Sequence, residues 1–346
     1  MKYYMAPMEG VTTYVFRRAY QNHYRPMDKY FIPFFVPHLQ KKFTSKEKNE
    51  LDLEHNRGMN VIPQILTSNA EDFIRLARNI QELGYEEINL NLGCPSKTVV
   101  SKGRGSGFLG EPDKLDRFLE KIYDELTDMK ISIKTRIGKD NSDEWEDLLA
   151  IYEKYPLEEL IIHPRMQIDY YKNIPQWDKM RYALENSKHS LCYNGDIFTV
   201  EDYKKWRQQF EDIDCIMLGR GLIANPILRE QIEDEVQREN LTRKENVSQL
   251  SGKSEKIDAK LRGKNGARCS DFERFRNFHN EVYEKYKEVL SGDRNILFRM
   301  KELWAYFRFQ FPDERKLWKK IQKCERCVVY ESIVSEFFSR NTEKIK

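Results

Sequence analysis

A parallel (β/α)8 TIM barrel followed by a C-terminal bundle of helices is the fold that this sequence of 346 residues predicts. Eight short runs rich in Ile, Val, Leu, Phe and Tyr lie mostly about 25–30 residues apart, the length of one strand and its crossover helix. No Gly-x-Gly-x-x-Gly turn follows the first run, which argues against a doubly wound sheet. The predicted strands cover residues 3–8, 30–36, 60–66, 87–93, 131–137, 159–165, 190–196 and 215–220.

The segments between these strands carry apolar residues at helical spacing. The helix expected after the third strand has one apolar face and Gly84 as its C-cap. That face consists of Phe73, Leu76, Ala77, Ile80 and Leu83. Another helix is expected to open at Asp113, directly after Pro112. The polar residues 38–58 follow the second strand, and we expect them to form a loop over the barrel mouth.

Strand-like runs stop near residue 240, which divides the sequence into a barrel domain, 1–240, and a helical domain, 241–346. The helical domain holds 25 Lys and Arg against 16 Asp and Glu, whereas the barrel domain holds 34 against 40. A basic module of this kind either binds a polyanion or presents a solvated helical surface. Residues 245–270 are polar and rich in Gly, Ser and Lys, which predicts a linker or a mobile loop.

The composition excludes several classes of protein. No run approaches the roughly 18 apolar residues of a membrane span, and the N-terminus lacks the apolar centre of a signal peptide. Six cysteines over this length favour reduced thiols and a cytoplasmic location rather than a disulfide framework. Cys324 and Cys327 form a C-x-x-C pair on a helical pattern without a second pair, so two thiols one helical turn apart is favoured over a zinc site. No metal is expected.

Polar side chains gather at the C-terminal ends of the predicted strands, where barrels of this type place their active sites. They are Met8 and Glu9, Gln64, Asn91 and Cys94, Lys134 and Arg136, His163 and Arg165, Asn194, Gly195 and Asp196, and Gly219 and Arg220. Several of them interrupt apolar runs, and burying such groups without partners costs a few kcal/mol each. A polar ligand at this end of the barrel is therefore expected.

Two groups of these residues predict ligand chemistry. Glycines occur at the ends of the seventh and eighth strands, where barrels often bind phosphate. Gly195, Gly219 and Arg220 are therefore expected to hold an anion. The alternative is that these glycines only shape turns. Lys134 and His163 lie on adjacent strands and are expected to face one ligand, such as a redox ring on which negative charge develops. The alternative interpretation of His163 is a core histidine whose hydrogen bonds are all made within the protein.

Cys94 ends the fourth strand in the stretch INLNLGCPSKTVVSKGRGSG (88–107) and has two open interpretations. A structural metal site is excluded because no second Cys or His lies nearby at ligand spacing. Cys94 is either a buried inert thiol or a proton donor or nucleophile at the barrel mouth, beside the basic residues Lys102 and Arg104.

Together these residues resemble the tRNA-dihydrouridine synthases, flavoenzymes with an FMN-binding barrel and a C-terminal helical domain. The most specific motif is NLNLGCPSKTVVSKGRGSGFL (89–109), and five others follow the family's order. They are APMEGVT (6–12), IKTRIG (133–138), IIHPR (161–165), NGDI (194–197) and MLGRG (217–221), with a looser match in RMKELWAYF (299–307). Pro164 and the polar stretch at 245–270 depart from the family pattern.

The resemblance implies that a uridine in the D-loop of tRNA is reduced to 5,6-dihydrouridine. NADPH reduces FMN, the flavin delivers hydride to C6 of the flipped-out uracil, and Cys94 protonates C5. The residues carried over for FMN are Pro7, Met8, Gln64, Lys134, His163, Asn194, Gly195, Asp196, Gly219 and Arg220. Those for the substrate are Asn91, Lys102, Arg104, Arg136, Arg165 and Tyr171. The candidates for gripping the tRNA backbone are Arg274, Arg276, Arg299, Lys301 and Arg308.

Two other functions stay open. An FMN barrel that oxidises or reduces a small molecule such as dihydroorotate would leave the basic helical domain unexplained. An RNA-binding protein with a non-catalytic barrel would bind tRNA without a flavin spectrum. We expect the protein to be a monomer that binds tRNA and NADPH and does not bind a membrane.

Overall fold

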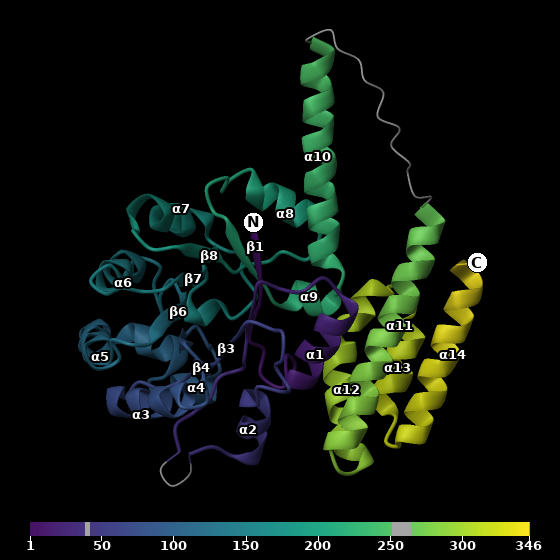
Figure 1. The fold of residues 1–346 in the computed structure, drawn as a ribbon, viewed down its shortest axis with the longest axis horizontal. Helices are drawn as coiled ribbons and strands as arrows, with labels where there is room; N and C mark the ends of the chain where they lie inside the picture. The colour runs from purple at the N-terminus through teal and green to yellow at the C-terminus, as the bar shows by residue number, and fades with distance from the viewer. Residues whose placement is uncertain (39–41, 251–263, 346) are drawn as a thin grey trace. The chain divides into compact units, whose positions relative to one another are not determined.

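The parallel sheet closes into a barrel. The computed structural model describes residues 1–38, 42–250 and 264–345, and its strands hydrogen-bond in the order β3-β2-β1-β9-β8-β7-β6-β5-β4. Only Pro63 separates β3 from β4, so the two ends of the sheet are one chain segment and the sheet forms eight strand positions around a ring (Figure 1). This confirms the predicted barrel. The strands are β1 (Lys2–Met5), β2 (Lys29–Phe31), β3 (Val61–Ile62), β4 (Gln64–Ile65), β5 (Glu87–Leu92), β6 (Lys130–Arg136), β7 (Leu160–His163), β8 (Leu191–Tyr193) and β9 (Cys215–Leu218).

Helices follow the strands along the chain, and Figure 1 shows α3, α5, α6 and α7 on the outside of the sheet. They are α1 (Tyr14–His23), α2 (Ser45–Leu51), α3 (Ala70–Gln81), α4 (Lys97–Val100), α5 (Pro112–Glu125), α6 (Glu144–Tyr152), α7 (Trp177–Asn186), α8 (Val200–Arg207) and α9 (Arg220–Ala224), with the 3-10 turns η1 (Gly105–Gly110) and η2 (Gln167–Asp169). Asn69 caps α3 by accepting a hydrogen bond from the Asp72 amide at 2.7 Å. The predicted apolar face of α3 is buried except for Leu83, which follows the helix and is exposed.

Two local predictions differ from the structure. The segment 38–58 is not a loop throughout, because α2 forms inside it with a Thr44–Glu47 capping box. The carboxylate of Glu50 on α2 binds the Arg17 guanidinium at 2.9 Å, which ties the segment to α1. The second strand is also shorter than predicted, since β2 ends at Phe31 and only an isolated bridge at Phe35 continues the pairing.

The barrel interior is apolar on one side and polar on the other. A cluster of apolar side chains joins β1, β2, β3, β7, β8 and β9; it consists of Tyr4, Ala6, Phe31, Ile62, Ile161, Cys192, Cys215 and Met217. On β5, every second residue is polar, at Glu87, Asn89 and Asn91, and all three are buried. Alternate residues of a strand face the same side, so β5 turns its polar side inward and packs Leu90 and its other apolar residues against the helices.

The chain packs into two compact units. The barrel unit comprises Met1–Arg17, Met27–Asp196 and Trp206–Gly219, and the helical unit comprises Arg18–Pro26, Ile197–Lys205 and Arg220–Lys346. The predicted domain boundary near residue 240 falls inside a helix of the second unit. That unit contains α10 (Leu228–Leu250), α11 (Lys264–Val289), α12 (Asp293–Phe307), η3 (Arg308–Gln310), α13 (Arg315–Lys323) and α14 (Cys327–Ile345).

Aromatic rings form much of the helical unit's core, as the helical spacing of the sequence predicts. Phe275 of α11 packs edge-on against Phe307 of α12, with ring centroids 5.2 Å apart. Tyr330 of α14 accepts a hydrogen bond from Trp304 at 2.8 Å and shares one of 2.6 Å with His279. Burial lowers the pKa of His279 to about 4, so at neutral pH its ring is uncharged and fits this apolar core.

The predicted linker and the C-x-x-C pair need correction. Helix α10 extends to Leu250 and α11 starts at Lys264, so the stretch 245–270 is helical at both ends; residues 251–263 lie outside the described residues. Cys324 caps the end of α13 and Cys327 begins α14, so the pair spans two helices rather than one turn of a single helix. Within the described chain, no helix is both long enough and apolar enough to span a membrane.

Candidate active site

The register of the central strands brings the predicted polar residues into one layer at the C-terminal end of the barrel. Asn91 of β5 pairs with Lys134 of β6, and Arg136 of β6 pairs with His163 of β7. Neighbouring residues of parallel strands project on the same side of the sheet, so these side chains share one end of the barrel. Cys94 lies two residues beyond Leu92, the last residue of β5.

Main-chain hydrogen bonds hold Cys94 in place. Its amide donates to Asn91 Oδ1 at 2.9 Å, and Asn91 Oδ1 also accepts from the Gly93 amide at 3.0 Å. Its carbonyl accepts from the amide and the hydroxyl of Ser106, at 3.1 and 2.8 Å. Ser106 was not among the predicted site residues. All of these bonds use main-chain atoms of Cys94, so they hold the residue without engaging its thiol.

The Cys94 side chain is only partly buried and remains a thiol at neutral pH. Burial raises the pKa of Cys94, and the nearby carboxylate of Glu9 raises it further. A hydrogen bond from the Ser96 amide and the positive charges of Arg136 and Lys134 oppose the rise without overcoming it. A protonated thiol can donate a proton but is a poor nucleophile, so Cys94 is suited to proton donation rather than to nucleophilic attack; an inert thiol stays the alternative.

Two glycines in the following loop provide a matched test of how tightly this main chain is packed. Gly105 and Gly103 both have positive φ, of 56° and 62°, so an alanine is strained at either position. A Cβ at Gly105 would lie 2.8 Å from the Cys94 carbonyl oxygen and 2.9 Å from Val99 Cγ1, whereas a Cβ at Gly103 meets nothing within 4 Å.

We therefore expect Gly105→Ala to lower the free energy of unfolding by about 1–3 kcal/mol more than Gly103→Ala does. Chemical denaturation of the two variants measures the difference. The Gly105→Ala substitution should also change the alkylation rate of Cys94, while Gly103→Ala should not. Equal effects of the two substitutions would show that the loop does not pack against Cys94.

Lys134 is a half-buried cation for which the described residues provide no anion. Within the described chain its ammonium has no hydrogen-bond or ion-pair partner. Burial, assisted by the positive charge of Arg136, lowers the pKa of Lys134 to about 8. A half-buried ammonium without a counter-charge is unfavourable, so its presence at the barrel mouth points to an anionic or electron-rich ligand.

His163, Arg165 and Asp196 form a connected group. Arg165 Nη1 lies 2.9 Å from His163 Nε2 and 3.1 Å from Asp196 Oδ1, and Arg165 Nη2 binds the second oxygen of Asp196. A guanidinium has no acceptor, so His163 Nε2 must accept this bond and the ring's proton lies on Nδ1. The Arg165 side chain is 1% exposed, and Nε donates to the Asn173 carbonyl at 2.6 Å. The buried Arg165 side chain thereby fixes the orientation of the His163 ring.

Arg136 joins the loops after β5 and β7. Its side chain is fully buried, and its three nitrogens donate to the carbonyls of Gly93, Met166 and Tyr170 at 2.8–2.9 Å. The guanidinium also lies 5.4 Å from the ring centroid of Tyr171. Tyr171 is 51% exposed and stacks 6.0 Å from the His163 ring, which leaves an aromatic surface at the mouth.

The predicted phosphate-binding residues have local contacts of their own. Asn194 Nδ2 donates to the Met217 carbonyl at 2.8 Å. A Cβ at Gly195 would fall 2.0 Å from the Tyr193 hydroxyl, so the Tyr193 ring already requires a glycine there. A Cβ at Gly219 would lie 3.3 Å from that of Ala6 and 3.7 Å from the sulfur of Met8, which places the partly exposed Pro7–Met8 turn beside the end of β9. In the helical unit, the Arg220 guanidinium lies 5.3 Å from the Phe198 ring centroid.

Lys102 and Arg104 lie between α4 and η1, on the loop that Cys94 begins. Lys102 is exposed and Arg104 partly so, and neither has an ion-pair partner among the described residues. Two uncompensated cations on one loop form a surface suited to phosphate. The described part of the chain contains no group of three metal-ligating side chains.

Gln64 and Asn91 face each other across β4 and β5, and Asn91 Nδ2 donates to Gln64 Oε1 at 2.7 Å. Two further buried residues, Asn89 and Ser132, continue this hydrogen bonding deeper into the barrel. Neither Asn89 nor Ser132 was among the site residues predicted from the sequence. The alternation of polar residues in EINLNL (87–92) was a signal that could have revealed Asn89.

Comparisons with known proteins show what this chain is similar to. The model of the family "Dihydrouridine synthase (Dus)" matches residues 4–294. The chain is 29% identical over 240 residues to tRNA-dihydrouridine synthase B of Pasteurella multocida, covering 69% of this chain and 70% of that one. It is 28% identical over 234 residues to the probable tRNA-dihydrouridine synthase 2 of Bacillus subtilis, covering 66% and 70%. Among solved structures, the old yellow enzyme from Trypanosoma cruzi matches with a TM-score of 0.48 and 11% identity, over 68% of this chain and 88% of that one.

Proposed function

The chain belongs to the dihydrouridine synthase family, a family of flavin oxidoreductases, and we propose that it reduces a uridine of tRNA to 5,6-dihydrouridine. The observation that carries the proposal is the pairing of a protonated thiol with an unpaired cation at one barrel mouth. Burial keeps Cys94 protonated, and Lys134 lies close enough for its charge to act on that thiol. One group can donate a proton to the base while the other stabilises an electron-rich ring.

The residues of the barrel mouth fit FMN. The ammonium of Lys134 has no anionic partner among the described residues, and His163 is held by Arg165 with its proton on Nδ1. Bound FMN would supply the hydride. We propose that Pro7, Met8, Gln64, Lys134, His163, Asn194, Gly195, Asp196 and Gly219 hold it, with Asp196 acting through Arg165. Arg220 lies in the helical unit, and its contact with FMN stays a prediction from the sequence.

The substrate uracil has to leave the RNA stack to reach this mouth. We propose that Tyr171 stacks on the flipped base and that Arg136 braces the Tyr171 ring from its buried position. Asn91 fixes the main chain of Cys94 and faces the same end of the barrel. Arg165 is proposed to position His163 rather than touch the base, because its guanidinium is already engaged.

Lys134 makes FMN binding dependent on pH. Since its pKa is about 8, the ammonium is charged below that pH and neutral above it. We expect the affinity of the apoprotein for FMN to fall as pH rises through this value, by about 10–100-fold, the worth of one charge-assisted hydrogen bond.

Titrations of FMN fluorescence below and above the Lys134 pKa measure this change. The variant Lys134→Met should bind FMN weakly at both pH values, without the pH dependence. The exposed Lys121, which pairs with Glu71 on the barrel surface, provides the control variant Lys121→Met. A wild-type affinity that does not change across this range would contradict the assigned role of Lys134.

The basic helical residues are proposed to bind the tRNA backbone, but they are not equally available. Arg274 donates to the His23 carbonyl at 2.6 Å and pairs with Glu230, so it serves the structure of its own unit. Lys301 donates to the Cys324 carbonyl at 2.6 Å, and Arg299 pairs with Glu302 at 2.9 Å. The better candidates are Arg276 and Arg308, which are exposed and lie against aromatic rings.

The proposal extends to a uridine of the D-loop as the target and to NADPH as the reductant. The test is to express the chain in cells that lack their own dihydrouridine synthases and to map dihydrouridine in their tRNA. We expect dihydrouridine at one D-loop position, and a purified protein with a flavin spectrum that NADPH bleaches. A yellow protein that leaves every tRNA uridine unchanged would contradict the proposal and favour a small-molecule reductase. Colourless protein that FMN does not reconstitute would contradict the flavin.

A further inference from the structure

A row of five buried polar side chains connects the bottom of the barrel to the Cys94 loop. This polar row consists of Glu87, Ser132, Asn89, Gln64 and Asn91. Ser132 Oγ donates to Glu87 Oε1 at 3.0 Å, and Asn89 Nδ2 donates to Ser132 Oγ at 2.9 Å. Gln64 Nε2 donates to Asn89 Oδ1 at 2.7 Å, and the bond from Asn91 to Gln64 completes the row.

Every hydrogen bond in the polar row points the same way, and Glu87 sets that direction. An ionised carboxylate only accepts, so the Ser132 hydroxyl must donate to it and is left to accept from an Asn89 N–H. Each amide side chain then donates toward Glu87 and accepts from the residue above it. The last acceptor, Asn91 Oδ1, therefore faces the amides of Gly93 and Cys94. Those amides can only donate, so both ends of the row impose the same orientation.

The row is shielded from bulk solvent over most of its length. Gln64, Asn89 and Ser132 are completely buried, and Glu87 and Asn91 are less than 10% exposed. An amide turned around in this setting would place two donors or two acceptors face to face. Each such fault would leave a buried donor or acceptor unpaired, so the row favours a single arrangement.

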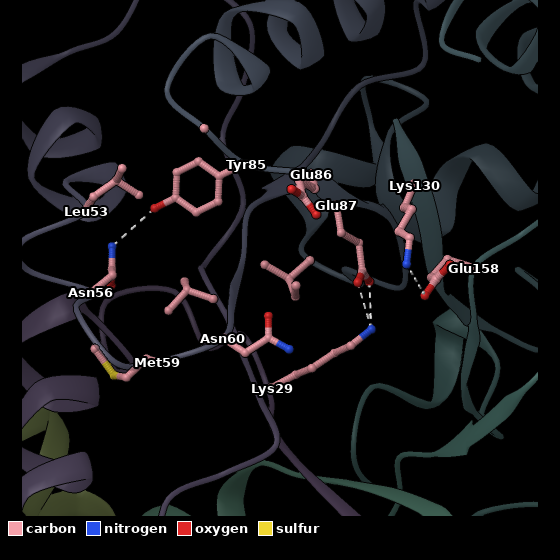
Figure 2. A pocket seen from close by; sticks show the side chains of 13 residues that line it. Lys29, Leu53, Asn56, Met59, Asn60, Tyr85, Glu86, Glu87, Lys130 and Glu158 are labelled. Atoms are coloured by element: carbon pink, nitrogen blue, oxygen red, sulfur yellow. Dashed lines mark hydrogen bonds and ion pairs between the residues drawn. The ribbon is translucent and has the colours of Figure 1, made fainter. Parts of the chain in front are cut away.

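A lysine completes the lower end. Lys29 Nζ binds both oxygens of Glu87, at 2.9 and 2.8 Å, and lies 3.7 Å from Glu159 Oε2. Burial works against the charge of Lys29, but the two carboxylates outweigh it and raise the pKa of Lys29. The Lys29–Glu87 pair lines a cavity of about 440 Å³ at the N-terminal end of the barrel. Figure 2 shows the two side chains pointing toward one another among the other lining residues. The Cys94 loop lies at the opposite end.

We propose that Glu87 is a positioning residue for Cys94, acting through the polar row on the main chain that presents the thiol. The inference rests on the proposed function, in which Cys94 donates the proton. In the proposed arrangement the Glu87 carboxylate touches neither the substrate nor the flavin. Its role is to keep Asn91 turned toward the Cys94 amide, so that the donor stays at a constant position above the reacting base.

Two substitutions break the polar row in different ways. Glu87→Gln keeps the shape of the side chain but allows either direction of hydrogen bonding, and Ser132→Ala removes one link with the loss of a single oxygen. Glu86→Gln is the matched control, because Glu86 lines the same cavity, is exposed and takes no part in the row. Thermal unfolding identifies which variants are folded, and Ser132→Ala keeps the test decisive if Glu87→Gln does not fold.

Two measurements on holoenzyme test the proposal. We expect Glu87→Gln and Ser132→Ala to lower kcat for dihydrouridine formation by about tenfold or more, with KM for tRNA nearly unchanged, as for a displaced catalytic group. Both should also change the alkylation rate of Cys94 by iodoacetamide several-fold, followed by mass spectrometry of the Cys94 peptide. Glu86→Gln should match the wild type in both measurements.

The alkylation rate separates failure of this proposal from failure of the proposed function. A folded Ser132→Ala variant with wild-type kcat and wild-type alkylation of Cys94 would overturn the positioning role alone. Loss of kcat in both row variants without any change in Cys94 alkylation would also overturn it, because the row would then act elsewhere. Full activity of a Cys94→Ser variant would instead remove Cys94 from the mechanism, whatever the row variants show.

Discussion

Replacing Cys94 with serine should reduce the rate of dihydrouridine formation by about 10²–10⁴-fold, the usual contribution of a general acid. A serine hydroxyl is a far weaker acid than a thiol but has nearly the same shape. The amide and carbonyl of this residue are held by Asn91 and Ser106, and a serine hydroxyl can accept from the Ser96 amide as the thiol does. The substitution therefore removes the acid while keeping the loop, and FMN content and tRNA affinity should not change.

Single-turnover reduction of tRNA uridine by flavin-loaded enzyme measures this effect directly. The control is Cys324→Ser in the helical unit, where the thiol donates to the Ile321 carbonyl at 3.0 Å and a hydroxyl can do the same. We expect this control to react at the wild-type rate. If Cys94→Ser also reacts at that rate, another group protonates the base, and the interpretation of Cys94 as an inert thiol gains support.

The second large effect is expected from the basic loop that follows Cys94. Lys102 and Arg104 have no carboxylate partners among the described residues, so their charges are available to RNA phosphates. We expect the double variant Lys102→Ala/Arg104→Ala to weaken tRNA binding. The slope of log Kd against log salt concentration should fall by about 1.4–1.8, since each lost phosphate contact removes 0.7–0.9.

A second double variant controls for the loss of charge. Lys121 and Lys154 are exposed on the barrel unit but already paired, with Glu71 and with Asp116 at 2.6 Å. Lys121→Ala/Lys154→Ala removes two positive charges without removing uncompensated ones. Filter binding across a series of salt concentrations compares the two. Equal slopes for both double variants would mean that tRNA senses only the net charge and not this loop.

Point substitutions serve this question better than truncation of the predicted helical domain. A cut after residue 240 would fall inside α10, in a unit that also includes Arg18–Pro26 and Ile197–Lys205. Loss of tRNA binding would then have two explanations, because folding and binding would change together. Surface variants such as Arg276→Ala and Arg308→Ala avoid this, since both side chains are exposed.

Local sequence patterns were sufficient for the barrel itself. The spacing of apolar runs reflects the length of a strand and a helix, a property that a short stretch of chain already possesses. The same patterns indicated Cys94, Lys134 and His163 as residues at strand ends, and the structure brings them to one end of the barrel. The errors arose where distant contacts decide the conformation, as in α2, which Glu50 attaches to Arg17.

The sequence by itself determined the family, the eight strand positions and the residue types available for chemistry, because these follow from order and spacing along the chain. Only the tertiary structure decided which polar groups are still available to a ligand. Arg165 has its guanidinium occupied by His163 and Asp196, whereas the described part of the chain gives Lys134 no anion. The physical reason is that a hydrogen bond depends on the position and direction of its partner, and here the partners come from different strands.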